Sequence, residues 1–172
     1  MEMIIRIALI NDIPDLVALI NSAYRGESSR AGWTTEADLL DGVRTDEEDL
    51  GSLMMDKHSI FLVGFDETGK NLLGCVHLQK KGKAMYLGML TVQPQLQAKG
   101  IGKQLLGAAE QYAKQQGCVS IEMTVISVRH ELITWYNKHG YQSTGVTKPF
   151  PASAKAGIAK QPLEFIVLSK LL

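Results

Sequence analysis

Apolar and polar positions near the start of the chain predict one short strand and one amphipathic helix. The apolar run Ile4–Ile7 has the length and composition of a strand. Over Ile13–Tyr24 apolar residues return every three or four positions, so one face of a helix would be apolar. Asn11 or Asp12 can cap this helix, because short polar side chains bind the free N–H groups of a first turn.

The next segment has a less regular pattern. Residues 25–33 contain two glycines and two serines, which is typical of a loop. A helical pattern opens at Thr35 and is interrupted by Gly42. Thr45 and Glu48 then have the spacing of a capping box, so they predict that a further helix follows.

Three apolar runs in the middle of the chain, at 60–65, 72–78 and 85–92, predict consecutive strands. The turn 66–70 between the first two has a glycine near its end, which suits a hairpin. A lysine-rich turn separates the second run from the third. Gly88 lies inside the third run and predicts a bulge or a parting of strands there.

The rest of the chain alternates helical and strand-like patterns. It predicts helices at 103–116 and 129–139, strands at 118–126, 141–146 and 163–168, and a long loop at 147–161. The complete order is β-α-α-β-β-β-α-β-α-β-β. The predicted fold class is therefore α/β (α+β), with helices packed on a sheet.

The composition is that of an ordinary globular protein. Apolar residues make up 45% of residues 1–172, enough for one core, so we expect a single domain. Lys and Arg number 18, as do Asp and Glu, and this balance gives no argument for nucleic acid or an anionic membrane as partner. No apolar run is long enough to span a bilayer, and the start lacks a signal-peptide pattern, so we expect a cytoplasmic protein.

The two cysteines carry no sign of chemistry. Cys75 and Cys118 fall in strand-like runs, without the spacing of a metal site or of a redox motif. We expect both to be reduced thiols in the core, and we expect no metal site.

The stretch 97–102, Gln-Ala-Lys-Gly-Ile-Gly, is the strongest signal of a ligand site. It joins a predicted strand to a predicted helix. Glycines let the backbone approach a ligand, and N–H groups at a helix N-terminus attract anions such as phosphate. A dinucleotide-binding motif would need a small residue in place of Leu105, and a P-loop would need Ser or Thr in place of Gln104. A glycine-rich turn without a ligand is the remaining alternative.

Together with residues 90–94, this stretch resembles the acyl-CoA binding motif of the GNAT N-acetyltransferase superfamily, Gln/Arg-x-x-Gly-x-Gly/Ala. The order of elements is similar to the GNAT fold over essentially the whole chain, and residues 135–141 resemble a second motif of the family. The resemblance implies a mixed central sheet with splayed middle strands and helices on both faces. Arg129 departs from the family pattern, where Asn is common; it either serves an anionic group or is a solvated helix start.

The resemblance also implies that acetyl-CoA is the acetyl donor. Backbone groups of Leu90 and Val92 would bind the pantetheine arm where two strands part, and a backbone N–H near Leu90 would polarise the acetyl carbonyl. The phosphates would lie on the loop and the start of the next helix. The implied cofactor-binding residues are Leu90, Val92, Gln97, Ala98, Lys99, Gly100, Ile101, Gly102 and Lys103.

The implied reaction is direct attack of a primary amine on the thioester, without an acylated residue. Tyr136 aligns with the tyrosine that assists departure of the thiolate in many relatives. The base that takes the proton of the amine is not indicated by the motifs, because the strand 85–92 has no carboxylate. The candidates are Glu36, His77 and Glu122, or a water oriented by Tyr86.

The acceptor pocket is expected to lie between segments 24–36 and 147–161. A small-molecule amine is the expected acceptor, since the long terminal loop favours a closed pocket. A peptide or protein acceptor, and a CoA-binding module without catalysis, are the alternatives. The sequence leaves open whether the protein is a homodimer. The residues expected around the acceptor are Arg25, Glu27, Arg30, Trp33, Phe150 and Pro151.

Overall fold

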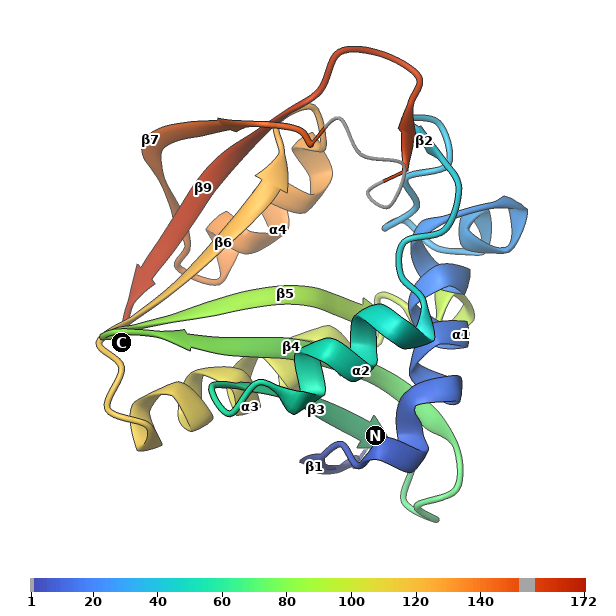
Figure 1. Ribbon diagram of the computed structural model, residues 1–172, viewed down its shortest axis with the longest axis vertical. Helices are drawn as coiled ribbons and strands as arrows, with labels where there is room; N and C mark the ends of the chain where they lie inside the picture. The colour runs from blue at the N-terminus through green and yellow to red at the C-terminus, as the bar shows by residue number, and fades with distance from the viewer. Residues whose placement is uncertain (1, 152–156) are drawn as a thin grey trace.

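The computed structural model describes residues 2–151 and 157–172. Its main feature is a seven-stranded sheet with the order β1-β3-β4-β5-β6-β9-β7, in which β5 and β6 are parallel and the other neighbours antiparallel (Figure 1). The fold class predicted from the sequence is confirmed. The strands are β1 (Ile4–Ile7), β2 (Leu40–Asp41), β3 (Ser59–Phe65), β4 (Leu72–Lys81), β5 (Ala84–Val92), β6 (Ser120–Ile126), β7 (Gln142–Pro149), β8 (Ile158–Ala159) and β9 (Glu164–Leu171), and the helices are α1 (Ile13–Tyr24), α2 (Glu47–Met55), α3 (Ile101–Gln115) and α4 (His130–Lys138).

Helices cover both faces of the sheet, because side chains along each strand alternate between the faces. In β3, Phe61 and Val63 pack with apolar residues of α1, whereas Leu62 between them packs with residues of α3. The helix α2 also packs on β3, on the side of α1. Each face of the middle strands is therefore closed by a helix.

The middle of the sheet is splayed. In the described chain, β5 pairs with β6 over residues 84–86 alone, and beyond these positions the two strands separate. On the other side of β5 the register with β4 shifts between Cys75 and His77, and Met89 has a left-handed φ of 48°. The bulge thus lies next to Gly88, as predicted. In Figure 1 the strands β6, β9 and β7 diverge from β4 and β5, and the opening faces α1.

Residues 35–42 form no helix, so the helix predicted to open at Thr35 was wrong. The segment instead contains β2 (Leu40–Asp41), which pairs antiparallel with β8 (Ile158–Ala159). The pairing continues where the N–H of Lys160 donates to the carbonyl of Leu39 at 2.8 Å. The partner of this segment is supplied by the far end of the chain, and a local pattern does not contain that information.

Two predicted helix caps also differ from the structure. Asp12 occupies the N-cap position of α1, but its carboxylate accepts the N–H of Leu9 at 2.7 Å and makes no cap bond to the helix. The cap of α2 is Asp46, whose carboxylate accepts the N–H of Asp49 at 2.8 Å. The hydroxyl of Thr45, which the capping-box spacing had suggested, has no hydrogen-bond partner among the described residues.

The other predicted elements are present with shifted ends. The helix α3 begins at Ile101, two residues earlier than expected, and β7 extends to Pro149, into the predicted loop. Residues 25–33 contain the short 3₁₀ helix Glu27–Ala31. Within the predicted loop 147–161, residues 152–156 lie outside the described part of the chain.

Two smaller expectations concern the cysteines and the membrane. Cys75 and Cys118 are free and buried, as predicted. Among the described residues, no helix is both long and apolar enough to cross a bilayer.

Candidate functional site

The loop before α3 has a backbone that favours an anion. Gly100 caps the helix with a φ of 85° and a ψ of 2°, and Ala98 has a φ of 66°. Left-handed residues alternating with ordinary ones are typical of backbone nests, in which successive N–H groups converge on an anion. A Cβ at Gly100 would meet no atom within 4 Å, so the left-handed backbone rather than lack of space favours glycine there.

Gln97 fastens this loop to the segment that precedes β2. Its Oε1 accepts the N–H groups of Trp33 at 2.8 Å and Thr34 at 3.2 Å. Its Nε2 donates to the Thr34 hydroxyl at 2.7 Å and to the carbonyl of Val92 at 3.1 Å. A Cβ at Gly32 would lie 2.4 Å from the same Oε1, so glycine is needed for this close approach. The Gln97 side chain therefore holds two segments together.

A cavity of about 280 Å³, the loop cavity, lies beside this turn. The indoles of Trp33 and Trp135, whose ring centres are 6.4 Å apart, form part of its apolar wall. Lys103 brings a cation to it, whereas Lys99 does not line it. The structure brings together all the other cofactor-binding residues expected from the sequence: Leu90, Val92, Gln97, Ala98, Gly100, Ile101, Gly102 and Lys103.

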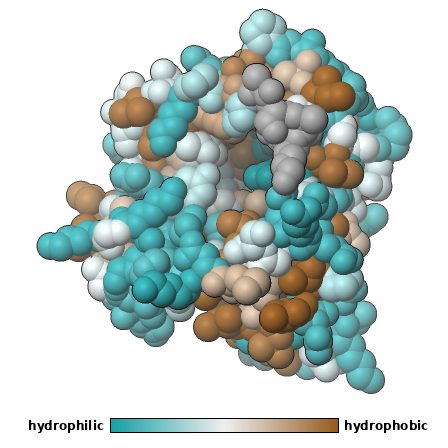
Figure 2. All heavy atoms as spheres, viewed as in Figure 1, coloured by the Kyte–Doolittle hydropathy of each residue, from teal (hydrophilic) through white to brown (hydrophobic). Residues whose placement is uncertain are grey.

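A second cavity of about 290 Å³, the splay cavity, lies where β5 and β6 part. Figure 2 shows the same face of the molecule hollowed in this opening. The two cavities share three lining residues, namely Leu90, Leu132 and Tyr136. The two cavities are therefore neighbours, and these three residues border both of them.

Tyr136 lies at the junction on α4. Its ring is 5% exposed and packs edge-on against Trp135 and Tyr141, with ring centres 5.1 and 5.7 Å away. The hydroxyl has no hydrogen-bond partner among the residues that the structure describes. Burial raises the pKa of Tyr136, so the hydroxyl stays protonated and can donate a hydrogen bond.

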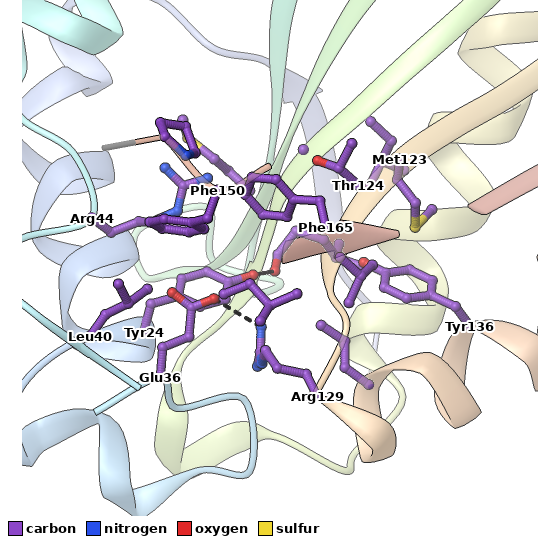
Figure 3. Close-up of a pocket in the computed structure, with 18 of the residues that line it drawn as sticks. Tyr24, Glu36, Leu40, Arg44, Met123, Thr124, Arg129, Tyr136, Phe150 and Phe165 are labelled. Atoms are coloured by element: carbon purple, nitrogen blue, oxygen red, sulfur yellow. Dashed lines mark hydrogen bonds and ion pairs between the residues drawn. The ribbon is translucent and has the colours of Figure 1, made fainter. Parts of the chain in front are cut away.

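Three charged side chains meet in the splay cavity. The Glu36 carboxylate accepts from Arg25 Nε at 3.1 Å. It also accepts from a terminal nitrogen of Arg129 at 3.1 Å (Figure 3). Arg129 also donates to the carbonyl of Thr34. Each side chain of this triad is less than a tenth exposed. Both Glu36 oxygens are thus held by guanidinium groups, and Arg129 is a buried partner of Glu36 rather than a solvated helix start.

The carbonyl groups of the two strand residues expected to bind pantetheine already have side-chain donors. The Tyr24 hydroxyl donates to the carbonyl of Leu90, and Gln97 donates to that of Val92. A carbonyl oxygen has two lone pairs, so each can accept a second bond. The register of β5 assigns no partner to Met89 or Leu90 on β4 or β6 within the described chain.

The structure does not bring His77 to either cavity. Its Nε2 lies 2.6 Å from the Ser59 hydroxyl, and its ring lies 4.8 Å from that of Phe61 in the core between β3 and α1. Burial lowers the pKa of His77 to about 4, so the ring is neutral near pH 7. Glu122 is exposed and lines neither cavity.

The expected acceptor residues divide into three groups. Arg25, Phe150 and Pro151 line the splay cavity, as expected. Trp33 lines the loop cavity instead. Arg30 pairs with Glu27 at 3.1 Å and with Asp38 at 2.9 Å, and neither Arg30 nor Glu27 lines a cavity. These residues differ in their surroundings because segment 25–36 changes direction at the 3₁₀ helix Glu27–Ala31. The contacts of Gln97 with Trp33 and Thr34 then hold the following residues at the loop cavity.

Sequence reasoning missed Arg44, Thr124 and Phe165, which also line the splay cavity. The hydroxyls of Tyr86 and Thr124 lie 3.1 Å apart, which joins β5 to β6 across the opening. Phe165 packs on Phe150 with ring centres 5.2 Å apart. Alternation along the strands would have placed Thr124 on one face of β6, but no local pattern distinguishes Arg44 from other surface arginines.

A sequence model described as the acetyltransferase (GNAT) family matches residues 15–141, which include the loop before α3 and the helix that carries Tyr136. The chain belongs to this family. GNAT acetyltransferases use acetyl-CoA as acetyl donor. No curated protein matches the chain.

Solved structures show the GNAT fold over almost the whole chain. A putative phosphinothricin N-acetyltransferase is 19% identical, with 99% of both chains covered and a TM-score of 0.73. The ribosomal-protein-S18-alanine N-acetyltransferase from Escherichia coli is 12% identical, with 99% of this chain and 94% of the other covered and a TM-score of 0.74. The PaiA N-acetyltransferase from Thermoplasma acidophilum, solved in complex with coenzyme A, is 20% identical over the full length of both chains, with a TM-score of 0.70.

Proposed function

We propose that this GNAT protein is an acetyl-CoA-dependent N-acetyltransferase that transfers the acetyl group to a primary amine of a small molecule by direct attack. The observation that carries the proposal is the meeting of two cavities at Leu90 and Tyr136. One molecule in each cavity would bring a donor and an acceptor into contact. Such a ternary arrangement needs no acylated residue.

The residues of the loop cavity fit acetyl-CoA. Backbone N–H groups around Gly100, together with Lys103, would hold phosphate, and the apolar wall of Trp33 and Trp135 would exclude water from the pantetheine arm. Bound there, acetyl-CoA supplies a thioester whose carbonyl is open to a nucleophile. The unpaired segment of β5 at Leu90 offers backbone hydrogen bonds next to that carbonyl.

Tyr136 is proposed to donate its hydroxyl proton in a hydrogen bond to the departing thiolate. The hydroxyl faces the shared wall and is not committed to another residue of the described chain. A hydrogen bond to a charged group is worth about 1.5–3 kcal/mol, and it is strongest when charge has developed on the sulfur.

The acceptor must be neutral before it attacks. Glu36 is poorly placed to take its proton, because both carboxylate oxygens are held by arginines. Arg25 and Arg129 help in another way, since a nearby positive charge disfavours the ammonium form of an amine. The Tyr86 and Thr124 hydroxyls are suited to hold a water that carries the proton away. Cys75 is not a nucleophile in this scheme, because burial raises its pKa to about 12.

The volume of the splay cavity, about 290 Å³, and the segments at its rim support a small acceptor. The pairing of β2 with β8 ties the segment after α1 to the C-terminal end of the chain, and Phe150 and Pro151 stand beside the cavity. A peptide or protein acceptor is the second candidate, because the ribosomal-protein-S18-alanine N-acetyltransferase from Escherichia coli shares the fold.

The test is a panel of small primary amines and of short peptides with free N-termini, offered with acetyl-CoA. Thiol release and the mass of the acetylated product are measured together. We expect product from small amines and little from peptides. Product from peptides alone would replace the small-molecule proposal, and tight CoA binding without transfer to any amine would indicate a module without catalysis.

A further inference from the structure

The described residues that line the splay cavity give it a positive charge. They include Arg25, Arg44 and Arg129 but a single carboxylate, that of Glu36. Three positive charges against one negative charge leave a net charge of +2. A cavity of this kind attracts anions and repels a second cation on the acceptor.

Two of the three arginines are already satisfied by the protein. Arg25 and Arg129 both bind Glu36, and each also donates to a backbone carbonyl, that of Val43 at 3.2 Å for Arg25 and that of Thr34 for Arg129. These two side chains therefore form the fixed wall of the cavity rather than a free binding group.

Arg44 is different. Its side chain is half-buried, and its guanidinium has no hydrogen bond or ion pair with any residue in the described ranges 2–151 and 157–172. Its backbone is held, because its N–H donates to the side-chain oxygen of Asn21 at 2.8 Å. A partly desolvated guanidinium that binds none of the described residues is suited to bind an anionic ligand, which would compensate for the lost hydration.

The position of Arg44 fixes which end of an acceptor it would meet. In Figure 3 Arg44 lies on one side of the cavity, beside Leu40, and Tyr136 lies on the opposite side. An acceptor that reaches both would present its amine at the shared wall and an anionic group at Arg44. The planar guanidinium matches the two oxygens of a carboxylate.

We propose that the acceptor is an amino acid-like amine carrying a carboxylate, and that Arg44 binds this carboxylate. The inference rests on the proposed acetyl transfer. The cavity volume of about 290 Å³ is just below the range of about 300–1,000 Å³ for sites that hold drug-sized ligands, which suits a molecule of amino acid size. A linear diamine would place a second cation beside Arg44 and is disfavoured.

The test compares acceptors that differ in the carboxylate alone. L-amino acids are measured against their carboxamides, and β-alanine and 4-aminobutyrate against their amides and against 1,4-diaminobutane. The ω-amino pairs matter because the amine is far enough from the carboxylate for its own pKa to change little. We expect kcat/KM to be about 10- to 100-fold higher for at least one carboxylate series.

The matched variants are Arg44→Gln and Arg30→Gln. Each removes one positive charge from the region between α1 and α2, but Arg30 lines neither cavity. Arg44→Gln should raise the KM for the carboxylate acceptor about 10- to 100-fold and leave the KM for the carboxamide and the Kd for acetyl-CoA within about two-fold. Arg30→Gln should preserve the preference, and Arg44→Lys should restore part of it.

The outcomes separate the inference from the proposed function. Efficient transfer to amides or diamines at the same rate as to carboxylates would overturn the role of Arg44 and leave the acetyltransferase intact. A carboxylate preference that survives in a folded Arg44→Gln protein would overturn it as well. The absence of transfer to every amine, with acetyl-CoA bound, would refute the proposed function itself.

Discussion

Replacing Tyr136 by phenylalanine removes one hydroxyl from the junction of the two cavities and leaves the ring in place. The packing against Trp135 and Tyr141 is made by the ring, so it should persist. The lost hydroxyl has no partner in the described chain. The free energy of unfolding should therefore change by less than about 0.5 kcal/mol.

The kinetic effect follows from the charge that the hydroxyl meets. A hydrogen bond to a charged group contributes about 1.5–3 kcal/mol, and every 1.4 kcal/mol is a factor of ten in rate. Loss of a bond that forms mainly as the thiolate departs should lower kcat about 10- to 150-fold. The Kd for acetyl-CoA should change by less than about three-fold, because the thioester sulfur of the ground state is a weak acceptor.

The assay is thiol release at saturating concentrations of both substrates, with the Kd measured by calorimetry. The raised pKa of Tyr136 keeps its hydroxyl protonated across the usual range, so the ratio of wild-type to variant rates should be constant from pH 6.5 to 9. A ratio that fell toward one at high pH would mean that the hydroxyl titrates there.

Tyr141→Phe is the matched control. Tyr141 is as buried as Tyr136 and packs on it, but its hydroxyl donates to Glu110 at 3.2 Å and lines neither cavity. Its loss should lower stability by about 1 kcal/mol and leave kcat unchanged. Equal kcat values for wild type and Tyr136→Phe, or equal losses in both variants, would refute the role of the Tyr136 hydroxyl.

Three further predictions concern other parts of the molecule. Gly102→Val should raise the Kd for acetyl-CoA at least ten-fold in calorimetry, because a Cβ at this position already lies 3.5 Å from Trp135 and the branched methyls would enter the loop cavity; an unchanged Kd in a folded variant would contradict this. Trp33→Ala should raise the Kd for acetyl-CoA more than the acceptor KM, the reverse of the effect expected from sequence, since Trp33 lines the loop cavity. His77→Gln should leave kcat unchanged but flatten the loss of unfolding free energy below pH 6.5 in urea titrations. The folded pKa of His77 is about 4 and the unfolded value about 6.5, so the wild type is fully stabilised above pH 6.5 and loses up to about 3 kcal/mol as the pH falls to 4; identical pH profiles would refute this.

The parts of the site predictable from sequence are those encoded by adjacent residues. The turn 97–102 is predictable because glycine, which stands at position 100, adopts a left-handed backbone with less strain than any other residue. Gly88 also marked the position of the bulge in β5, although the left-handed residue of the bulge is its neighbour Met89. Apolar periodicity located α1, α3 and α4, because each buries one face against the sheet.

The parts that escaped prediction depend on contacts between distant segments. Glu36 is bound by Arg129, and Gln97 is bound to Thr34, and neither pairing leaves a trace in local spacing. The segment after Thr35 has helical spacing, yet pairing of β2 with β8 prevails over that propensity. His77 was a candidate base because of its intrinsic pKa. Its place in the core depends on its contact with Ser59 on a neighbouring strand, and local spacing does not show that contact either.

The wall shared by the two cavities has a consequence for the redesign of this protein. Leu132 lines both the loop cavity and the splay cavity, so under the proposed function a substitution there would alter the binding of acetyl-CoA and of the acceptor together. Arg44 and Phe150 border the splay cavity alone. Variant libraries that aim at a new acceptor should therefore change residues that border the splay cavity alone and keep the shared wall constant. Changes in acceptor selectivity would then leave the binding of acetyl-CoA unaffected.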